Sequence, residues 1–336
     1  MNSYFIGIEG TREAFREISL GVILSLIIAM AASFISVHYG GPTMLLALLI
    51  GMSLNFFSED VRCNRGILLM SRTVLRVGIA LLGLRITFAN VMELGYAPII
   101  GILATVTCTI LFGVLMASIL KLNLKFGVLS GSAVAICGAS AALAISSILP
   151  PYKEREDDTL LVVIGVTTLS TLAMVFYPII TNVLELSDFE SSFFLGGTIH
   201  DVAQVVGAGY ILSEDIGDYS TLVKLLRVGM LVPITIGLSF VLMLRNYETE
   251  SRIVFPWFLL GFVVLVVLNS VELISEPVKL QANGFSRGCL LSAVAALGMK
   301  TSLQKLGKVG FRPFLLLALE SVFIVIMILA AIFLMR

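Results

Sequence analysis

Long apolar stretches separated by short charged breaks constrain this chain more than any other feature of its sequence. Each is long enough, or nearly so, to cross about 30 Å of hydrocarbon. We place eleven of them, at residues 17–37, 41–56, 66–87, 95–119, 126–148, 157–184, 191–211, 219–244, 253–273, 283–301 and 311–335. Only 13% of the residues are charged, against about 25% in soluble domains. The sequence therefore predicts an all-α polytopic membrane protein, with residues 1–336 forming one membrane domain.

The composition also excludes several classes of protein. The 22 Lys and Arg residues balance the 22 Asp and Glu residues, which gives no sign of a nucleic-acid partner. The four cysteines, Cys63, Cys108, Cys137 and Cys289, are scattered, so we expect neither a metal site nor a disulfide framework. Nucleophile elbows, Walker loops, HExxH and Rossmann fingerprints are missing from the sequence. We therefore expect neither an enzyme nor a bound cofactor.

Basic residues in the breaks predict the orientation of the chain. With a cytoplasmic N-terminus, twelve lie inside: Arg12, Arg16, Arg62, Arg65, Lys121, Lys125, Arg245, Arg252, Lys300, Lys305, Lys308 and Arg312. Four then lie outside: Lys153, Arg155, Lys279 and Arg336. This excess follows the positive-inside rule, so we predict an inner-membrane protein with its N-terminus inside and its C-terminus outside. The main exception is the break at 153–158, which would move inside if 126–148 were re-entrant rather than crossing.

Short matches in the same order indicate an internal repeat. Gly40-Gly41, the run 75–78 and the set Cys137, Ser140 and Ala141 match Gly196-Gly197, the run 226–229 and the set Cys289, Ser292 and Ala293. These matches pair residues 39–184 with 191–336, five helices in each copy, and leave 1–38 as an extra helix. An odd number of helices forces the second copy to insert upside down, as in many secondary transporters. A rival match of Ser71-Arg72 with Ser286-Arg287 implies a different unit and leaves the alignment open.

The segment 193–210, FFLGGTIHDVAQVVGAGY, carries polar residues within one membrane-spanning length. Ionisable side chains at membrane depth mark functional sites, because they are costly unless they face a wet cavity or a partner. We expect Gly197 and Thr198 to bind substrate, and His200, Asp201 and Gln204 to serve in proton coupling or gating. The alternative is a tightly packed helix in which these side chains only bond to their neighbours.

Two further segments contain the small residues that permit close crossing or a break in a helix. The first, 126–148, holds Ser132, Gly138 and Ser140, and the second, 283–301, holds Arg287. Two crossed discontinuous helices would direct half-helix N-termini at a bound anion. Ordinary small-residue packing explains the same pattern without a ligand.

Basic residues deep within the apolar stretches favour anion binding. Arg76 lies about 15 Å along its helix, near the middle of the bilayer, by the rise of 1.5 Å per residue. Arg227 and Arg287 add cations from two other helices, whereas snorkelling toward the helix end explains Lys224. The internal acids available as partners are Asp201 and Glu320. A structural ion pair of Arg76 with Glu320 is the alternative to an anion site.

Four blocks of sequence resemble those of a known family. They are SGSAVAICGASAALA (130–144), GGTIHDVAQVVGAGY (196–210), VKLLRVGMLVP (223–233) and SRTVLRVGIALLGLRI (71–86). They are similar to the bacterial sulfate exporter family of uncharacterised conserved membrane proteins, over nearly the whole chain. The resemblance implies the fold of the sodium/proton antiporter and bile-acid symporter superfamily, with inverted five-helix repeats, two crossed broken helices and an elevator-like movement. It places the broken helices at 126–148 and 283–301.

We therefore predict a secondary transporter of a small anion, such as sulfate, sulfite or a related sulfur-containing anion. Arg76, Arg227 and Arg287 would balance the charge of the anion, while Ser132, Gly138, Ser140, Gly197 and Thr198 would replace its water. Protons or sodium would be the coupling ion, through His200, Asp201, Gln204 and Glu320, and a homodimer is left open. One alternative is a cation/proton antiporter that uses Asp201 and Glu320. Another is a membrane scaffold or sensor subunit that transports nothing.

Overall fold

The computed structural model describes residues 2–93, 95–244, 256–301 and 310–336, with the side chains of 2–17, 91 and 93 left out. All regular secondary structure in these ranges is helical. Five helices are long and apolar enough to cross a membrane: Ile18–Tyr39, Tyr96–Ile119, Arg155–Val183, Glu214–Leu244 and Phe311–Met335. Several shorter apolar helices accompany them, so the count of eleven spans stays a prediction. Of the basic residues used to orient the chain, Arg245, Arg252, Lys305 and Lys308 lie outside the described ranges.

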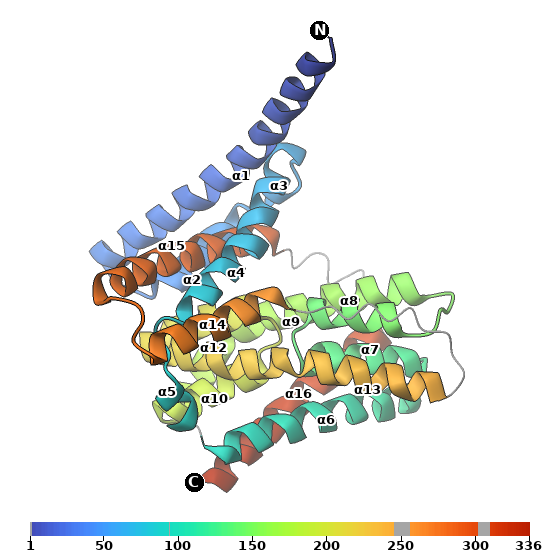
Figure 1. Cartoon of the computed structure of the whole chain (residues 1–336). Coiled ribbons are helices and arrows are strands. Elements are labelled where there is room, and N and C mark those ends of the chain that lie inside the picture. The colour runs from blue at the N-terminus through green and yellow to red at the C-terminus, as the bar shows by residue number, and fades with distance from the viewer. Residues whose placement is uncertain (1, 94, 245–255, 302–309) are drawn as a thin grey trace. The chain divides into compact units, whose positions relative to one another are not determined.

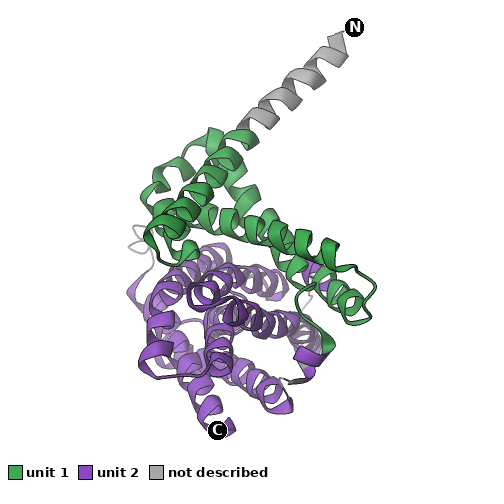
Figure 2. Ribbon diagram, turned by 90° about the vertical axis from the view of Figure 1, so that its left-hand side faces the viewer, with its two compact units in different colours: residues 1–88, 261–302 green, residues 89–260, 303–336 purple. Residues whose placement is uncertain are grey.

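The chain divides into two compact units, each built from separate parts of the sequence (Figure 2). Unit 1 comprises residues 1–88 and 261–302, and unit 2 comprises residues 89–260 and 303–336. The predicted repeats, 39–184 and 191–336, cut across this division and stay a prediction. We describe each unit by itself.

Unit 1 is a bundle around α1 (Asn2–Tyr39), α2 (Thr43–Ser53) and α15 (Glu276–Lys300). It also contains η1 (Asn55–Ser58), α3 (Val61–Leu68), the π-helical turn η2 (Leu69–Val74), α4 (Leu75–Leu82) and the later part of α14 (Trp257–Ser270). Its core joins residues of α1, α2, α3 and α15, among them Ile28, Ala47, Ile67 and Ala296. Because α15 is continuous from Glu276 to Lys300, the expected break within 283–301 is wrong.

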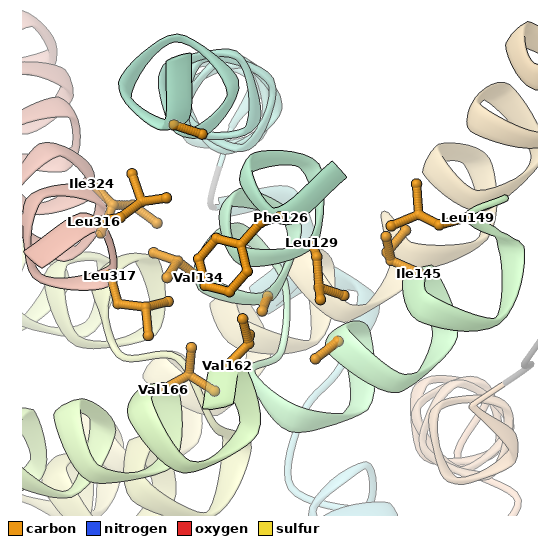
Figure 3. Packing of buried hydrophobic residues seen from close by; sticks show 13 residues of the cluster. Phe126, Leu129, Val134, Ile145, Leu149, Val162, Val166, Leu316, Leu317 and Ile324 are labelled. Carbon is orange, nitrogen blue, oxygen red and sulfur yellow. The ribbon is translucent and has the colours of Figure 1, made fainter. Parts of the chain in front are cut away.

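Unit 2 contains the remaining helices. After α5 (Phe88–Glu93), which starts at the boundary, come α6 (Tyr96–Ile119), α7 (Leu124–Ala135), α8 (Ala139–Ile148), α9 (Arg155–Val183), α10 (Asp188–Thr198), α11 (Val202–Leu212), α12 (Glu214–Gly229), α13 (Leu231–Leu244) and α16 (Phe311–Met335). Buried side chains of α6, α7, α8, α9 and α16 form one core (Figure 3). The cluster includes Phe126, Val134, Val166 and Leu317. Close packing of these apolar side chains stabilises the unit.

The helices α7 and α8 form a hairpin rather than one continuous rod. Lys125 Nζ, at the start of α7, donates to the carbonyl of Pro150, just after α8, at 3.4 Å. Phe126 and Leu149, near the same two ends, belong to one hydrophobic cluster. The open end of the hairpin, formed by the start of α7 and the end of α8, therefore lies next to the start of α9. α7 and α8 lie together at one end of unit 2 (Figure 1).

The helices α10 and α11 form a second hairpin from the opposite end. Along α9, Ser170 Oγ accepts from Asp201 N at 3.1 Å, Thr171 meets Gln204, and Met174 lies against Gly207. α11 therefore runs in the same direction as α9, toward the end where α9 stops and α10 starts. At that end Arg336, which follows α16, bonds Glu190 in the first turn of α10 at 2.6 Å. The two hairpins thus enter unit 2 from opposite ends.

Local sequence explains where these short helices start. Asn123 caps α7 by accepting from Lys125 N at 2.9 Å, and Ser187 and Glu190 form a capping box on α10. Asp201 caps α11 by accepting from Ala203 N at 3.1 Å. Side-chain caps of this kind satisfy the first N–H groups of a helix, which have no partner within it. α8 differs, because Gly138 stands at its N-cap with φ of 61° and provides no side chain.

Candidate functional site

The tips of the two hairpins meet inside unit 2. One tip is residues 136–138, between α7 and α8, and the other is residues 199–201, between α10 and α11. A Cβ placed on Gly138 would lie 3.7 Å from the carbonyl oxygen of His200, so the tips are in contact. Gly138 has a positive φ, a conformation that glycine adopts at little cost.

Lys224, on α12, joins the two tips. Its ammonium group donates to Ile136 O at 2.7 Å and to Ile199 O at 2.8 Å, and the side chain is fully buried. Both carbonyls follow the last turn of a helix, α7 in one hairpin and α10 in the other. The expectation that Lys224 snorkels to a helix end is therefore wrong.

Arg227, one turn further along α12, bonds the ends of the same two helices. Its Nε and Nη2 donate to Ala135 O at 2.8 Å and Val134 O at 2.7 Å. Its Nη1 donates to the carbonyls of Gly196, Gly197 and Ile199 at 2.8–3.1 Å. The planar guanidinium presents donors in a fixed fork, which suits two carbonyl clusters on different hairpins.

These contacts set the charge of the site. The C-terminal ends of α7 and α10 carry partial negative charge, which two buried cations offset. Neither Lys224 nor Arg227 has a carboxylate partner in the part of the chain that the structure describes. The opposite sides of the tips are the N-terminal ends of α8 and α11, which carry partial positive charge. The tips are therefore electropositive overall, even with Asp201 at the N-cap of α11.

The N-terminus of α8 is the accessible part of the tips. Ser140 is exposed and Ala139 is half-buried, whereas residues 130–138 are all buried. The N-cap of α8, Gly138, has no side chain that could accept from the first N–H groups of the helix. Asp201, at the second tip, is half-buried. An anion that approached Ser140 would meet a hydroxyl and the N-terminal end of α8, which favours negative charge.

His200 is buried at the second tip and bonds α16. Its Nε2 lies 2.9 Å from Ser321 Oγ, and that hydroxyl donates to Leu317 O. Both residues line a groove of about 340 Å³ between α9 and α16, whose other residues, such as Leu169, Phe176 and Val325, are mainly apolar. We therefore do not assign this groove to an anion.

Glu320, beside Ser321 on α16, contacts the first hairpin. Its Oε1 accepts from Ser130 Oγ of α7 at 2.7 Å, and its Oε2 has no hydrogen-bond partner within the described part of the chain. The side chain is fully buried, with Gly113 of α6 against Oε1. Consecutive residues of α16 thus bond the two different hairpins.

The other predicted site residues fall in different places. Thr198 donates to Phe194 O. Ser132 Oγ and Gln204 Oε1 are buried and have no hydrogen-bond partner among the residues that the structure describes. Arg76 and Arg287 belong to unit 1, where they are exposed on the neighbouring helices α4 and α15. Ten of the twelve predicted residues therefore lie in unit 2, and their roles in binding or coupling stay predictions.

Lys224 and Ser130 were not among the site residues predicted from the sequence. Lys224 could have been found from its spacing, because it lies three residues before Arg227 on the same face of a helix. A single serine in a helix of small residues gave no comparable signal for Ser130. Glu320 was recognised as a buried acid, but its partner lies 190 residues away in the sequence.

The apolar helices, the buried tips and the polar residues inside unit 2 define a multi-pass helical membrane protein. The model of the family "Conserved hypothetical protein 698" matches residues 20–317, and the chain belongs to this family. It is 45% identical to UPF0324 membrane protein CT0845 of Chlorobaculum tepidum over 97% of this chain and 92% of that protein. It is 43% identical to UPF0324 membrane protein TauZ of Paracoccus pantotrophus over 97% of this chain and 98% of that protein.

Proposed function

We propose that the protein is a secondary transporter of a small anion and that the anion binds at the hairpin tips, beside Ser140. The observation that carries the proposal is the meeting of two opposed hairpins at Lys224 and Arg227. Irregular backbone at membrane depth is tolerated only inside protein or along a wet cavity. Broken helices whose termini face a ligand are a recurrent feature of secondary transporters.

The charge of the tips favours an anion over a cation. Lys224 and Arg227 contribute two positive charges, whereas Asp201 is the only acidic residue in the tips themselves. In this proposal Arg227 acts through the backbone: it fixes the carbonyl ends, and the N-terminus of α8 receives the ligand. Sulfate and sulfite are the first candidates, because of the sequence resemblance and because both accept several hydrogen bonds.

The hairpins also support the proposed orientation in the inner membrane. Five described basic residues of unit 2 lie at the end where the first hairpin enters: Lys121, Lys125, Lys153, Arg155 and Arg312. Arg336 alone lies at the opposite end among the described residues of this unit. A re-entrant α7–α8 hairpin therefore moves Lys153 and Arg155 to the cytoplasmic side, which strengthens the positive-inside pattern.

Alternating access follows from hairpins that enter from opposite sides. If the α7–α8 hairpin gates the cytoplasmic side, the α10–α11 hairpin gates the other side. The anion would be carried between them with the rest of unit 2, in the elevator-like movement expected from the sequence resemblance. Protons or sodium remain the candidate coupling ions, and a homodimer stays a proposal.

The test is anion counterflow into proteoliposomes that contain the purified full-length protein, with labelled sulfate and sulfite as probes. Ser140→Asp puts a fixed carboxylate where the anion would bind, at a helix N-terminus that tolerates acidic residues. We expect at least a tenfold loss of flux, about 1.4 kcal/mol. Ser147→Asp is the matched control, because Ser147 is exposed on the same helix, and its flux should stay within about twofold of wild type.

Three outcomes would contradict the proposal in different ways. Equal flux in Ser140→Asp and Ser147→Asp would place the anion elsewhere. Sodium flux coupled to protons and lost in Asp201→Asn would favour the cation/proton antiporter. Wild-type protein that neither transports these ions nor gains thermal stability from them would favour a scaffold or sensor subunit.

A further inference from the structure

Among the acids of unit 2 within the described ranges, Glu320 is the most deeply buried, and it has no basic partner there. It is fully buried near the middle of α16, one of the helices long enough to span a membrane. Ser130 gives it a single hydrogen bond, and Oε2 has none. An ionised carboxylate in such surroundings is strongly disfavoured unless it is paired or well hydrogen-bonded. A neutral carboxylic acid leaves only one O–H group without an acceptor, so these surroundings favour the protonated form of Glu320 over the carboxylate.

The helices around Glu320 provide no charge that would replace the proton. α6, α7, α9 and α10 all pack on α16. Their titratable side chains are Tyr96 and Cys108 in α6, Lys125 in α7, Arg155, Glu156, Asp157, Asp158 and Tyr177 in α9, and Asp188 and Glu190 in α10. The charged side chains of α9 and α10 lie in the first turns of those helices. Lys125 of α7 lies five residues from Ser130, about 7.5 Å along the helix, but its ammonium group donates to Pro150 O at 3.4 Å. His200, which bonds the adjacent Ser321, is the one titratable group linked to this turn of α16.

The partner of Glu320 belongs to the hairpin that we propose to gate the cytoplasmic side. Ser130 lies on α7, and Gly113 and Gly127 let α6 and α7 approach so closely that a Cβ on Gly127 would lie 2.7 Å from Gly113 O. A displacement of α7 away from α16 would break the hydrogen bond between Ser130 and Glu320 and would expose the carboxyl group. Water that enters the gap stabilises the carboxylate and accepts the proton.

We propose that Glu320 is the proton-binding residue of the transport cycle, which holds its proton while α7 packs on α16 and releases it to water when the α7–α8 hairpin moves. This inference rests on the proposed function, because it assigns the coupling ion to the same cycle. It assigns the two ions to different places: Glu320 binds the proton, and the hairpin tips bind the anion.

The first test needs no substrate. Infrared difference spectra between wild type and Glu320→Gln at neutral pH should show the carbonyl band of a protonated carboxylic acid in the wild type only. Glu190→Gln, which removes an ion-paired carboxylate at the surface, should leave that band in place. A wild-type spectrum without the band, or a band that persists in Glu320→Gln, would overturn the proposal.

The second test measures coupling in proteoliposomes. Glu320→Gln keeps the shape of the neutral acid and an oxygen that accepts from Ser130, and its anion counterflow is measured alongside to show that the variant is folded and active. Accumulation driven by a pH gradient should fall to the level without a gradient, while Glu190→Gln keeps both activities. Gradient-driven accumulation in Glu320→Gln would refute the proton role. If the wild-type protein shows no anion counterflow, the proposed anion transport is refuted. The infrared result would still decide the protonation of Glu320.

Discussion

At the scale of single residues, the role of a charged side chain depends on its burial and on the group that it hydrogen-bonds. The sequence indicates the burial but rarely the hydrogen-bond partner. A cation or an acid inside an apolar stretch must have a partner, which is why Arg227 and Glu320 were recognised. The partners themselves are Val134, Ala135 and three carbonyls of the second hairpin for Arg227, and Ser130 for Glu320. Backbone carbonyls at a helix end have no signature in the sequence, so the role of Arg227 as a link between hairpins could not be predicted.

Removal of the Arg227 side chain should destabilise unit 2 strongly. Arg227→Met keeps most of the volume but leaves the carbonyls at two helix ends without their donors. Buried unsatisfied polar groups cost about 1–3 kcal/mol each, so we expect a loss of about 3 kcal/mol or more. Thermal unfolding in detergent measures it. Arg62→Met is the control, because Arg62 is exposed and bonds only Asp60 in the same turn, and its unfolding temperature should scarcely change.

At the scale of helices, the hydropathy of 126–148 predicts one span because it adds two half-length helices together. What reveals a hairpin is the meeting of its ends, Lys125 with Pro150, and such a long-range contact has no periodicity to detect. The same addition hid the second hairpin within 191–211. Gly138 and the acidic N-cap Asp201 were visible in the sequence, so the positions of the tips were within reach, whereas their direction was not.

The conformation of the first tip depends on Gly138. Gly138→Ala finds ordinary contact distances around the new Cβ, the nearest atom being 3.6 Å away. It must nevertheless adopt φ near +61°, which costs about 1–2 kcal/mol for a residue with a Cβ. We expect a lower unfolding temperature and slower anion flux. Gly237→Ala, within α13 and with no atom within 4 Å of the new Cβ, should be neutral or stabilising; equal effects of the two variants would argue against a strained tip.

The end of α16 is fastened to α10 in a pH-dependent way. The Arg336 guanidinium lowers the pKa of Glu190 to about 2 from its ordinary 4.5. A lowered pKa in the folded state stabilises the protein above the ordinary value, and this stabilisation disappears as the pH falls from about 4.5 toward 2. The difference in unfolding temperature between wild type and Arg336→Gln should therefore be constant near neutrality and shrink on acidification. A difference that grows on acidification would contradict this assignment.

At the scale of the whole chain, the sequence predicted a helical membrane protein with the cytoplasmic basic residues at one end, but it assigned the wrong segment to the second break. Residues 283–301 belong to the continuous α15, and the second break lies at 199–201. The repeat that the sequence suggested stays a prediction. Within unit 2 the two hairpins resemble each other. Their tips, at Ile136 and Ile199, both accept from Lys224, and each hairpin is followed by a long helix.

The two hairpins predict a membrane topology that differs from eleven crossings. Cysteines introduced at Lys121 and Lys153 should react with an impermeant thiol reagent from the same, cytoplasmic side, and a cysteine at Glu185 should react from the opposite side. Eleven crossings would instead separate Lys121 from Lys153. Labelling of intact and opened cells measures this. The native cysteines are buried or half-buried, and the unmodified protein gives the background.

The bond of Lys224 to both tips also bears on how the chain is made. Synthesis proceeds from the N-terminus, so both hairpins leave the ribosome before the helix that neutralises their carbonyl ends. Until Lys224 and Arg227 are synthesised, the carbonyl groups at the ends of α7 and α10 lack these hydrogen-bond donors. Each hairpin would therefore stay at the membrane interface or within the insertion machinery. Insertion of the central third is therefore expected to be a single late event that follows the synthesis of α12, which carries Lys224 and Arg227.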